Sequence, residues 1–396
     1  MKILILYPNS FPIGGAATNR IISLCRALTE KGHYVKVIIT RPTERSGFEL
    51  NHSIKGSYLG IEYEYSTNSI IWPENKLLQF KEHFLGSIKT VIKILKEHRK
   101  RKIDLIVSAA TYTFFENLPY YLLAKTLKTK LVLTIDEYPW VIIHKENYSS
   151  VYRWLYLSFY YKLFDGFIVM TKTLLSYYSK LATHQAKFVH IPMTVDVERF
   201  DIDPRPRKEE YIAYCGGRAG DNIDGVDILL KAFNLIKDQF PDLKLYIAGK
   251  TSESTNKLIE SLSLSKHVVL IGFIERDLVP ELLMNSRALC LARKNNVQAD
   301  GGFPTKLGEY LASGRPTIVT KVGELSDYLS DGLSTFFARP GDVKDFADKL
   351  IFVLENAAFS QKVGVEGKRV ALKFFSYKNH SNALDAFIKM IVCEDK

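Results

Sequence analysis

Short apolar segments alternate with longer segments of helical periodicity along nearly the whole chain. The short segments are rich in β-branched residues and lack the polar alternation of a half-exposed strand. They occupy residues 2–8, 34–40, 103–109, 130–136, 166–171 and 187–192 in the first half, and residues 211–217, 244–250, 268–273, 288–293, 316–321 and 334–340 in the second half. Apolar strands separated by helices indicate parallel sheets that are covered on both faces. Two such series predict two doubly wound α/β domains.

A polar stretch separates the two series. Residues 194–210, TVDVERFDIDPRPRKEE, carry two prolines and no apolar period, which predicts a linker near residue 200. We therefore expect Rossmann-like domains over 1–200 and 201–375, and a last helix over 376–396 that packs back toward the first domain. Ligands of open parallel sheets bind beyond the carboxyl ends of the strands. We expect the site at the turns that follow the strands, in a cleft between the two sheets.

Composition and cysteine usage narrow the class of protein. A chain of 396 residues with 46% hydrophobic and 24% charged residues is typical of a globular protein with two domains. The four cysteines are scattered singly, which argues against a zinc site or a disulfide framework and fits a reducing, cytoplasmic compartment. We expect no signal peptide, because the first apolar run ends at Tyr7, and no stretch reaches the roughly 18 apolar residues of a membrane span.

The formal net charge of +11 predicts anionic partners. Nucleotide phosphates, nucleic acid and an acidic membrane surface all fit this charge. Aromatic residues are not interleaved with basic residues as in RNA-binding platforms, so we expect no nucleic-acid partner.

Glycine pairs follow the first strand of each predicted domain. Gly14 and Gly15 precede an amphipathic helix, where a helix start favours an anion or a ligand rich in hydroxyl groups. In the second domain, Gly216 and Gly217 precede Arg218, a residue type suited to bidentate phosphate contact. The alternatives are a plain tight turn at the first pair, and an arginine that only pairs with a neighbouring acidic residue at the second.

Residues 301–316, GGFPTKLGEYLASGRP, predict a helix with an open N-terminus that carries a lysine and a glutamate. A diphosphate requires orphan backbone amides and a cation, and a ribose requires a carboxylate acceptor about one helical turn further on. This pattern therefore favours a nucleotide-sugar site. An ordinary capped helix is the alternative.

Several segments, through their order and spacing, resemble the family 4 glycosyltransferases, which are retaining enzymes of the GT-B fold. The resemblance covers nearly the whole chain. It rests on GGAATNRIISLCRALTEKGHYVKVI, HIPMTVDVERF, YCGGRAGDNIDGVDILLKAF, KLYIAGK, VVLIGFIERDLVPELLMNSRALCL, GGFPTKLGEYLASGRPTIV and VGELSDYL. It implies two doubly wound parallel-sheet domains that face each other across a cleft, the first for the acceptor and the second for the nucleotide sugar.

The resemblance gives roles to the positions that match. Arg218, beside Gly217, would hold the donor pyrophosphate, and Phe273 and Ile274 would meet the nucleobase through backbone groups. The co-substrate would be a nucleoside-diphosphate sugar of the UDP or GDP type, with no other cofactor and no metal.

The helix after residue 304 receives the remaining roles. Glu309 would accept hydrogen bonds from the ribose hydroxyls, and Thr305, Lys306 and Leu307 would present amides to the phosphates. Lys306 would add charge, so that it and Arg218 would stabilise the leaving diphosphate.

Three positions depart from the family pattern. The family has two glutamates with seven residues between them, and the first falls on Gly301, beside Asp300 as the nearest carboxylate. The lysine that usually follows the phosphate-binding arginine is Asp224, so Lys250 or Lys306 would replace it. These departures bear on the donor sugar and on catalysis, whereas fold and nucleotide binding do not depend on them.

The third departure lies in the first domain. A histidine often found after the fourth strand of that domain is absent from LTIDEYPW, where Asp136 or Glu137 would take its place.

A basic amphipathic segment predicts association with a membrane surface. Residues 80–102 place Phe84, Ile88, Val91 and Leu95 on one stripe among lysines and arginines. The aromatic segment 148–164 would lie beside it, with its headgroup contacts made by Trp154, Tyr156 and Tyr160. The alternative is a solvated helix whose apolar stripe packs on the sheet.

Together these features predict a metal-independent glycosyltransferase of the hexosyltransferase type. It would extend a surface polysaccharide or glycolipid at the inner face of the plasma membrane, with a glycan or lipid-linked acceptor. A nucleotide-sugar epimerase on the same scaffold and a non-catalytic GT-B partner subunit remain alternatives.

Overall fold

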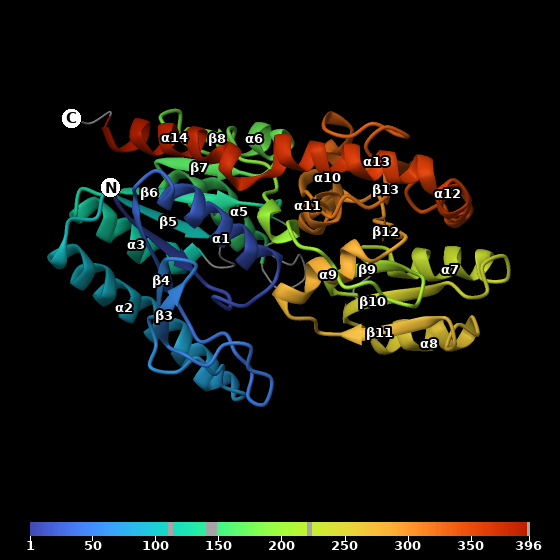
Figure 1. Ribbon diagram of the computed structural model, residues 1–396. Helices are drawn as coiled ribbons and strands as arrows, with labels where there is room; N and C mark the ends of the chain where they lie inside the picture. Colours follow the sequence, from blue (N-terminus) through green and yellow to red (C-terminus); the bar gives the residue numbers. More distant parts are fainter. Residues whose placement is uncertain (110–113, 140–148, 220–223, 394–396) are drawn as a thin grey trace. The chain divides into compact units, whose positions relative to one another are not determined.

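The computed structural model describes residues 1–109, 114–139, 149–219 and 224–393 (Figure 1). The chain divides into two compact units. Unit 1 comprises Met1–Pro192 together with Tyr377–Lys396, and unit 2 comprises Met193–Ser376. Each unit is an α/β domain built on one largely parallel sheet, so the predicted fold class is confirmed.

Unit 1 contains an eight-stranded sheet of order β3-β4-β2-β1-β5-β6-β7-β8. The strands are β1 (Lys2–Tyr7), β2 (Tyr34–Ile39), β3 (Lys55–Tyr58), β4 (Ile61–Tyr65), β5 (Leu105–Ala109), β6 (Lys130–Ile135), β7 (Gly166–Val169) and β8 (Lys187–His190). All neighbours are parallel except β3 and β4. Every residue of β1 is buried, as expected for an apolar strand that is covered on both faces.

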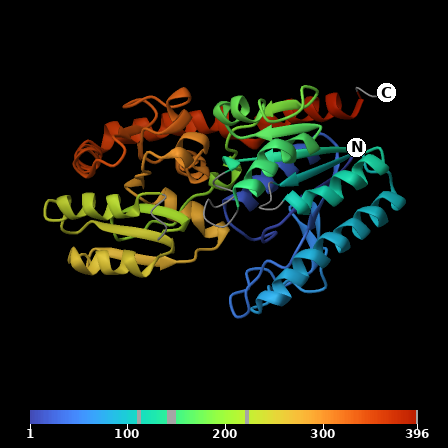
Figure 2. The same cartoon turned by 180° about the vertical axis from the view of Figure 1, so that it is seen from behind.

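Helices cover both faces of this sheet. They are α1 (Ala16–Thr29), α2 (Lys76–Lys100), α3 (Phe114–Thr126), α5 (Ser150–Phe159), α6 (Lys172–Tyr178) and α14 (Ser381–Cys393), with short helices η1 (Tyr160–Leu163) and η6 (Tyr377–His380). α1 and α14 pack on each other and share one core with β1 and β2. The last helix therefore belongs to the core of unit 1 through Leu384, Phe387 and Ile391. α2 and α3 lie side by side, as Figure 2 shows from behind.

Unit 2 contains a six-stranded sheet of order β11-β10-β9-β12-β13-β14, in which all neighbours are parallel. The strands are β9 (Tyr211–Arg218), β10 (Lys244–Lys250), β11 (Val268–Gly272), β12 (Ala288–Leu291), β13 (Thr317–Thr320) and β14 (Phe336–Ala338). The helices are α7 (Val226–Ile236), α8 (Glu253–Ser261), α9 (Val279–Met284), α10 (Val297–Gly301), α11 (Thr305–Ala312), α12 (Val343–Glu355) and α13 (Ala357–Val370), with short helices η2 (Val197–Phe200), η3 (Arg276–Leu278), η4 (Gly323–Asp327) and η5 (Ala371–Phe375). The strand order reverses between β9 and β12.

Two features differ from the sequence-based expectation. The β3–β4 hairpin was not predicted, because β4 alternates buried and partly exposed residues and β3 is exposed, so neither forms an apolar run. The segment after residue 193 is not a solvated linker at its start. Met193, Val195 and Phe200 are buried, and the amide of Val195 donates to the carbonyl of Phe375 at 2.8 Å.

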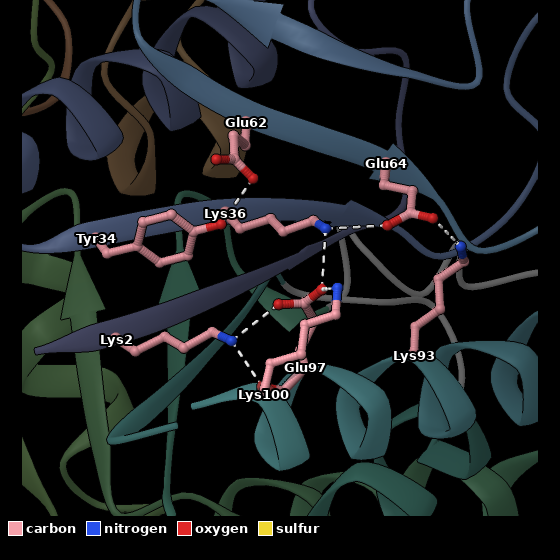
Figure 3. Close-up of polar contacts among 8 residues, drawn as sticks. All are labelled: Lys2, Tyr34, Lys36, Glu62, Glu64, Lys93, Glu97 and Lys100. Atoms are coloured by element: carbon pink, nitrogen blue, oxygen red, sulfur yellow. Dashed lines mark hydrogen bonds and ion pairs between the residues drawn. The ribbon is translucent and has the colours of Figure 1, made fainter. Parts of the chain in front are cut away.

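α2 is held to the sheet by charged residues rather than by an apolar face. Its buried positions are Gly86, Thr90, Ile94 and Glu97. The Glu97 carboxylate accepts hydrogen bonds from Lys2 at 2.8 Å, Lys36 at 3.2 Å and Lys100 at 2.9 Å (Figure 3). Burial opposes ionisation of this carboxyl, but the hydrogen bonds from Lys100 and Lys2 and the charge of Lys36 outweigh burial and lower its pKa to about 2.

The same network extends to β4, the strand next to the edge strand β3. Lys36 also donates to Glu64 at 3.0 Å, and Lys93 forms an ion pair with the other oxygen of Glu64 (Figure 3). The lysine at position 93, predicted as part of a free basic stripe, therefore binds the sheet.

The apolar stripe of α2 is partly exposed. Phe84 is 63% exposed and Ile88 is 43% exposed, whereas Val91 and Leu95 are half-buried. The exposed part of the stripe also includes Leu77, Phe80 and Ile92. The stripe continues into solvent because the helix packs on the sheet through its small and charged face.

The expectation for the aromatic segment is partly wrong. Tyr156 and Tyr160 are fully buried and stack on each other with ring centroids 4.3 Å apart, so neither is available to lipid headgroups. The two rings pack inside unit 1 because they lie on the inner side of α5 and η1. Trp154 is 60% exposed, and Val151 and Phe159 share that outer side. None of the helices among the described residues has both the length and the apolar character of a membrane span.

Candidate functional site

The point where the strand order of unit 2 reverses brings the predicted phosphate-binding elements together. In doubly wound sheets, ligands bind beyond the carboxyl ends of the strands at such a reversal. β9 ends in Gly216, Gly217 and Arg218. The adjacent strand, β12, ends nearby. The backbone of Arg218 lies in β9, but its side chain is outside the described part of the structure. A Cβ at Gly216 would lie 2.6 Å from Cε of Lys306, so the end of β9 passes close to α11.

Asp224 is the centre of a buried polar cluster at this reversal. Its carboxylate forms an ion pair with Lys306 and accepts a hydrogen bond from the Tyr214 hydroxyl at 2.7 Å. Nε of Arg293 lies 3.8 Å from the other carboxylate oxygen. Burial opposes ionisation of Asp224, but the charge and hydrogen bond of Lys306 outweigh it and lower the pKa of this carboxyl.

Backbone packing fixes the position of Asp224. The next residue, Gly225, has a φ of +68°, and a Cβ there would overlap the carbonyl oxygen of Ala292. A glycine is therefore required both for the left-handed conformation and for the close approach of the two loops. This contact places the loop before α7 directly against the loop after β12.

Glu309, which lies on α11, forms an ion pair with Arg199. Its Oε1 accepts a hydrogen bond from Nη1 of Arg199 at 2.6 Å, and the Nη2 of Arg199 donates to the carbonyl of Arg276. Arg199 lies in the segment that was expected to be a linker. This pairing has no signal in the sequence, because 110 positions separate the two residues.

The first turn of α11 is only partly open. Pro304 is the N-cap and supplies no side-chain hydrogen bond. The amide of Leu307 donates to the carbonyl of Pro304 at 3.0 Å, so it is already used within the turn. Thr305 and Lys306 precede it, and both side chains are half-buried.

The other predicted donor-site residues lie around the same edge of the sheet. Lys250 ends β10 and is paired in register with Arg218 of β9, and it is exposed. Phe273, directly after β11, is 62% exposed, and Ile274 is half-buried. Asp300 is exposed on α10.

The predicted residues of unit 1 lie at the carboxyl ends of its strands. Gly14 permits the Ser10 carbonyl to approach the backbone closely, because a Cβ at position 14 would lie 2.7 Å from that carbonyl oxygen. Gly15 is the N-cap of α1, with open space around its Cα. Asp136 follows β6 and lies 2.6 Å from Nε of the buried Arg20. The Asp136 carboxylate therefore links the end of β6 to α1.

Three residues of unit 2 were missed by sequence reasoning: Tyr214, Arg199 and Arg293. Each meets a predicted residue only through the tertiary fold. A cationic cluster with one carboxylate beside a second, arginine-paired carboxylate suits an anionic ligand that also carries hydroxyl groups. In the described ranges, no group of three His, Cys, Asp or Glu side chains could hold a metal ion.

Two models of glycosyltransferase families match the chain. A model of group 1 glycosyl transferases matches residues 196–370, and a model of glycosyltransferase family 4 matches residues 13–199. A search of curated protein sequences gives no significant match.

Three solved structures illustrate the structural similarity. Sucrose-phosphate synthase from Thermosynechococcus elongatus has a TM-score of 0.75 and 15% identity over 99% of both chains. The Anabaena protein HepE, in complex with UDP and glucose, has a TM-score of 0.69 and 14% identity over 98% of both chains. WaaG, a glycosyltransferase involved in lipopolysaccharide biosynthesis, has a TM-score of 0.68 and 14% identity over 98% of this chain and 99% of WaaG. The two family models together span residues 13–370, and the chain belongs to the family 4 glycosyltransferases of the GT-B fold.

Proposed function

We propose that the chain is a retaining, metal-independent hexosyltransferase. It transfers a sugar from a nucleoside-diphosphate donor of the UDP or GDP type to a glycan or a lipid-linked glycan. The observation that carries the proposal is the convergence of Lys306, Arg293 and the end of β9 at the strand-order reversal of unit 2. Unit 2 binds the donor, and unit 1 binds the acceptor. HepE, a structural relative, is seen with UDP and glucose.

The residues of unit 2 suit the leaving group of this reaction. Departure of a nucleoside diphosphate leaves negative charge on the phosphates, and fixed cations stabilise that charge in the transition state. Lys306 and Arg218 supply the charge, and the first amides of α11 add to it. Glu309 accepts hydrogen bonds from the ribose with the oxygen that Arg199 leaves available. These cations take the part that a divalent metal has in other transferases.

The direct test is the release of nucleoside diphosphate from a panel of UDP- and GDP-sugars, with and without EDTA. We expect slow hydrolysis of one donor, unaffected by EDTA, and proton NMR should show that the released sugar first has the donor's anomeric configuration. Loss of activity in EDTA with recovery in manganese would contradict metal independence. Conversion of the donor to an isomeric nucleotide sugar would show an epimerase.

A non-catalytic partner subunit is the second candidate. The ion pair between Lys306 and Asp224 favours it, because a carboxylate stands where the family pattern has a lysine. In that case the chain would bind a nucleoside diphosphate but release none from any donor.

We further propose that unit 1 associates with an anionic membrane at the cytoplasmic side, where a lipid-linked acceptor is within reach. The support is the exposed apolar stripe on α2, with Phe80 at 77% and Phe84 at 63% exposure, flanked by Lys81 and Lys89. Apolar side chains insert at the headgroup boundary while lysines attract anionic lipids. WaaG, another structural relative, is involved in lipopolysaccharide biosynthesis, which is consistent with a surface polysaccharide or glycolipid as product.

A further inference from the structure

Arg293 is a buried cation whose guanidinium is only partly hydrogen-bonded within the part of the chain that the structure describes. Only 5% of the residue is exposed, and it lies two residues beyond the end of β12. Among the residues that the structure describes, its Nε and Nη1 atoms have no hydrogen-bond acceptor. A buried guanidinium that keeps unpaired N–H groups is destabilising. We therefore expect such an arginine to have a function that offsets this cost.

The contact between Arg293 and Asp224 does not supply those hydrogen bonds. Nε and the carboxylate oxygen are 3.8 Å apart, whereas a structural ion pair of this type has about 2.7–2.9 Å between nitrogen and oxygen. Asp224 already accepts from Lys306 and Tyr214. Among the described residues, two cations therefore share one carboxylate, and these three side chains together carry a net positive charge.

The backbone of Arg293 is fixed at the carboxyl end of the sheet. Its carbonyl accepts a hydrogen bond from the Thr320 hydroxyl at 2.6 Å, and the preceding Ala292 packs against Gly225. The guanidinium is thus held next to Asp224 and Lys306, at the reversal where the donor nucleotide binds in the proposed function.

We propose that Arg293 binds the diphosphate of the donor and replaces the cation that the family pattern places at position 224. Asp224 is a positioning residue, which holds Arg293 and Lys306 apart and directs both toward the phosphates. The phosphate oxygens supply the acceptors that Nε and Nη1 lack. The planar guanidinium offers two parallel N–H groups to one phosphate, which a lysine cannot do. The inference rests on the proposed nucleotide-sugar site.

Calorimetric titration of UDP and GDP, with uridine and guanosine as matched ligands without phosphate, tests the proposal. Arg293→Gln and Arg293→Met should bind the better diphosphate ten- to a hundredfold more weakly than wild type, as for one lost charge-assisted hydrogen bond at about 1.5–3 kcal/mol. Affinity for the nucleoside should not change. Arg287→Gln, at the amino end of the same strand, removes an equal charge and should bind like wild type.

The outcomes separate this inference from the proposed function. If the wild type binds neither diphosphate, the proposed function fails. If the wild type binds one and both Arg293 variants bind it equally well, only the role of Arg293 is overturned.

A measurement on the wild type covers the case in which both variants fail to fold. The arginine Nε–Hε signals are recorded in ¹⁵N–¹H spectra with and without the diphosphate, and the Arg293 signal is assigned in the wild type through its own backbone resonances. We expect this signal to shift on addition of the diphosphate and to stay in place with the nucleoside. An Arg293 signal that stays in place at saturating diphosphate would overturn the proposal.

Discussion

At the scale of single residues, the site of unit 2 is organised by two carboxylates that bind arginine or lysine side chains. Asp224 gathers Lys306, Tyr214 and Arg293, and Glu309 is oriented by Arg199. In both cases, the partner comes from a distant part of the sequence. The residue types of Arg218, Lys306 and Glu309 could be read from the sequence, because they sit at the end of a strand and in the first turns of a helix. Their partners could not, because only the tertiary fold brings them into contact.

A double comparison tests the role of Glu309. Wild type should bind UDP more tightly than 2′,3′-dideoxy-UDP by roughly tenfold or more, because a hydrogen bond to a charged acceptor is worth about 1.5–3 kcal/mol. Glu309→Ala should bind both nucleotides alike and at the weaker level, as measured by calorimetry. Glu210→Gln, an exposed partner of Arg287, serves as the control. If Glu309→Ala still prefers the ribose form as strongly as wild type does, the carboxylate has another role. GDP and its dideoxy form replace the uridine pair if GDP binds better.

Gly225 allows a test of the loop contact beside Asp224. Alanine at this position would adopt a φ of +68° and overlap the Ala292 carbonyl, whereas at Gly332 a Cβ at a φ of +70° meets open space. Left-handed backbone alone costs about 1–2 kcal/mol for a residue with a Cβ. Gly225→Ala should therefore lower Tm in calorimetry clearly more than Gly332→Ala does. Equal Tm values for the two variants would show that the loops separate without strain.

At the scale of elements, α2 illustrates which features a sequence pattern can predict. The helix was expected over 80–102 and spans Lys76–Lys100, capped by Asn75. The pattern could not tell which face is buried, because its apolar stripe and its charged face fit either orientation. Glu97 decides the orientation by binding Lys2 of β1 and Lys36 of β2. The strands were predicted well where they are apolar throughout, and β3 and β4 were missed because they are not.

Glu97 makes the attachment of α2 dependent on pH. Its pKa is about 2 in the folded chain, against 4.5 for the unperturbed group, so its contribution to stability is complete above about pH 4.5 and is lost as pH falls toward 2. Removing one partner of a buried ion pair costs about 3–5 kcal/mol. Glu97→Gln should lower Tm at pH 7, and the deficit should shrink in acid. Glu82→Gln on the same helix is the control. A deficit that stays constant from pH 7 to pH 3 would contradict the ion-pair account.

The exposed stripe of α2 gives a test of membrane association. Wild type should sediment with vesicles that contain anionic lipid and much less with neutral vesicles, and salt should weaken binding over a Debye length of about 8 Å. Phe80→Ser/Phe84→Ser should reduce binding several-fold. Phe352→Ser/Phe359→Ser is the control in unit 2, because it makes the same substitution at two partly exposed phenylalanines outside α2. Equal sedimentation with neutral and anionic vesicles, or no loss in the α2 variant, would leave the stripe without this role.

At the scale of the whole molecule, the chain builds two α/β domains on the same plan. The strand order of unit 2 creates one reversal, and glycines, cations and a helix start lie around it. The domain plan followed from the apolar periodicity alone. The limits of the domains did not follow from this periodicity. Residues 193–200 have no apolar period, yet Met193, Val195 and Phe200 are buried.

Hydrogen–deuterium exchange with mass spectrometry tests directly whether a nucleoside-diphosphate sugar binds at this reversal. The wild-type chain is compared with and without a saturating UDP- or GDP-sugar, chosen by calorimetry. We predict slower exchange in peptides that cover residues 214–218, 224–228, 291–294 and 305–310. We predict no change in β14, which lies at the far edge of the same sheet. Protection at β14, with none at the four named segments, would contradict binding at this reversal.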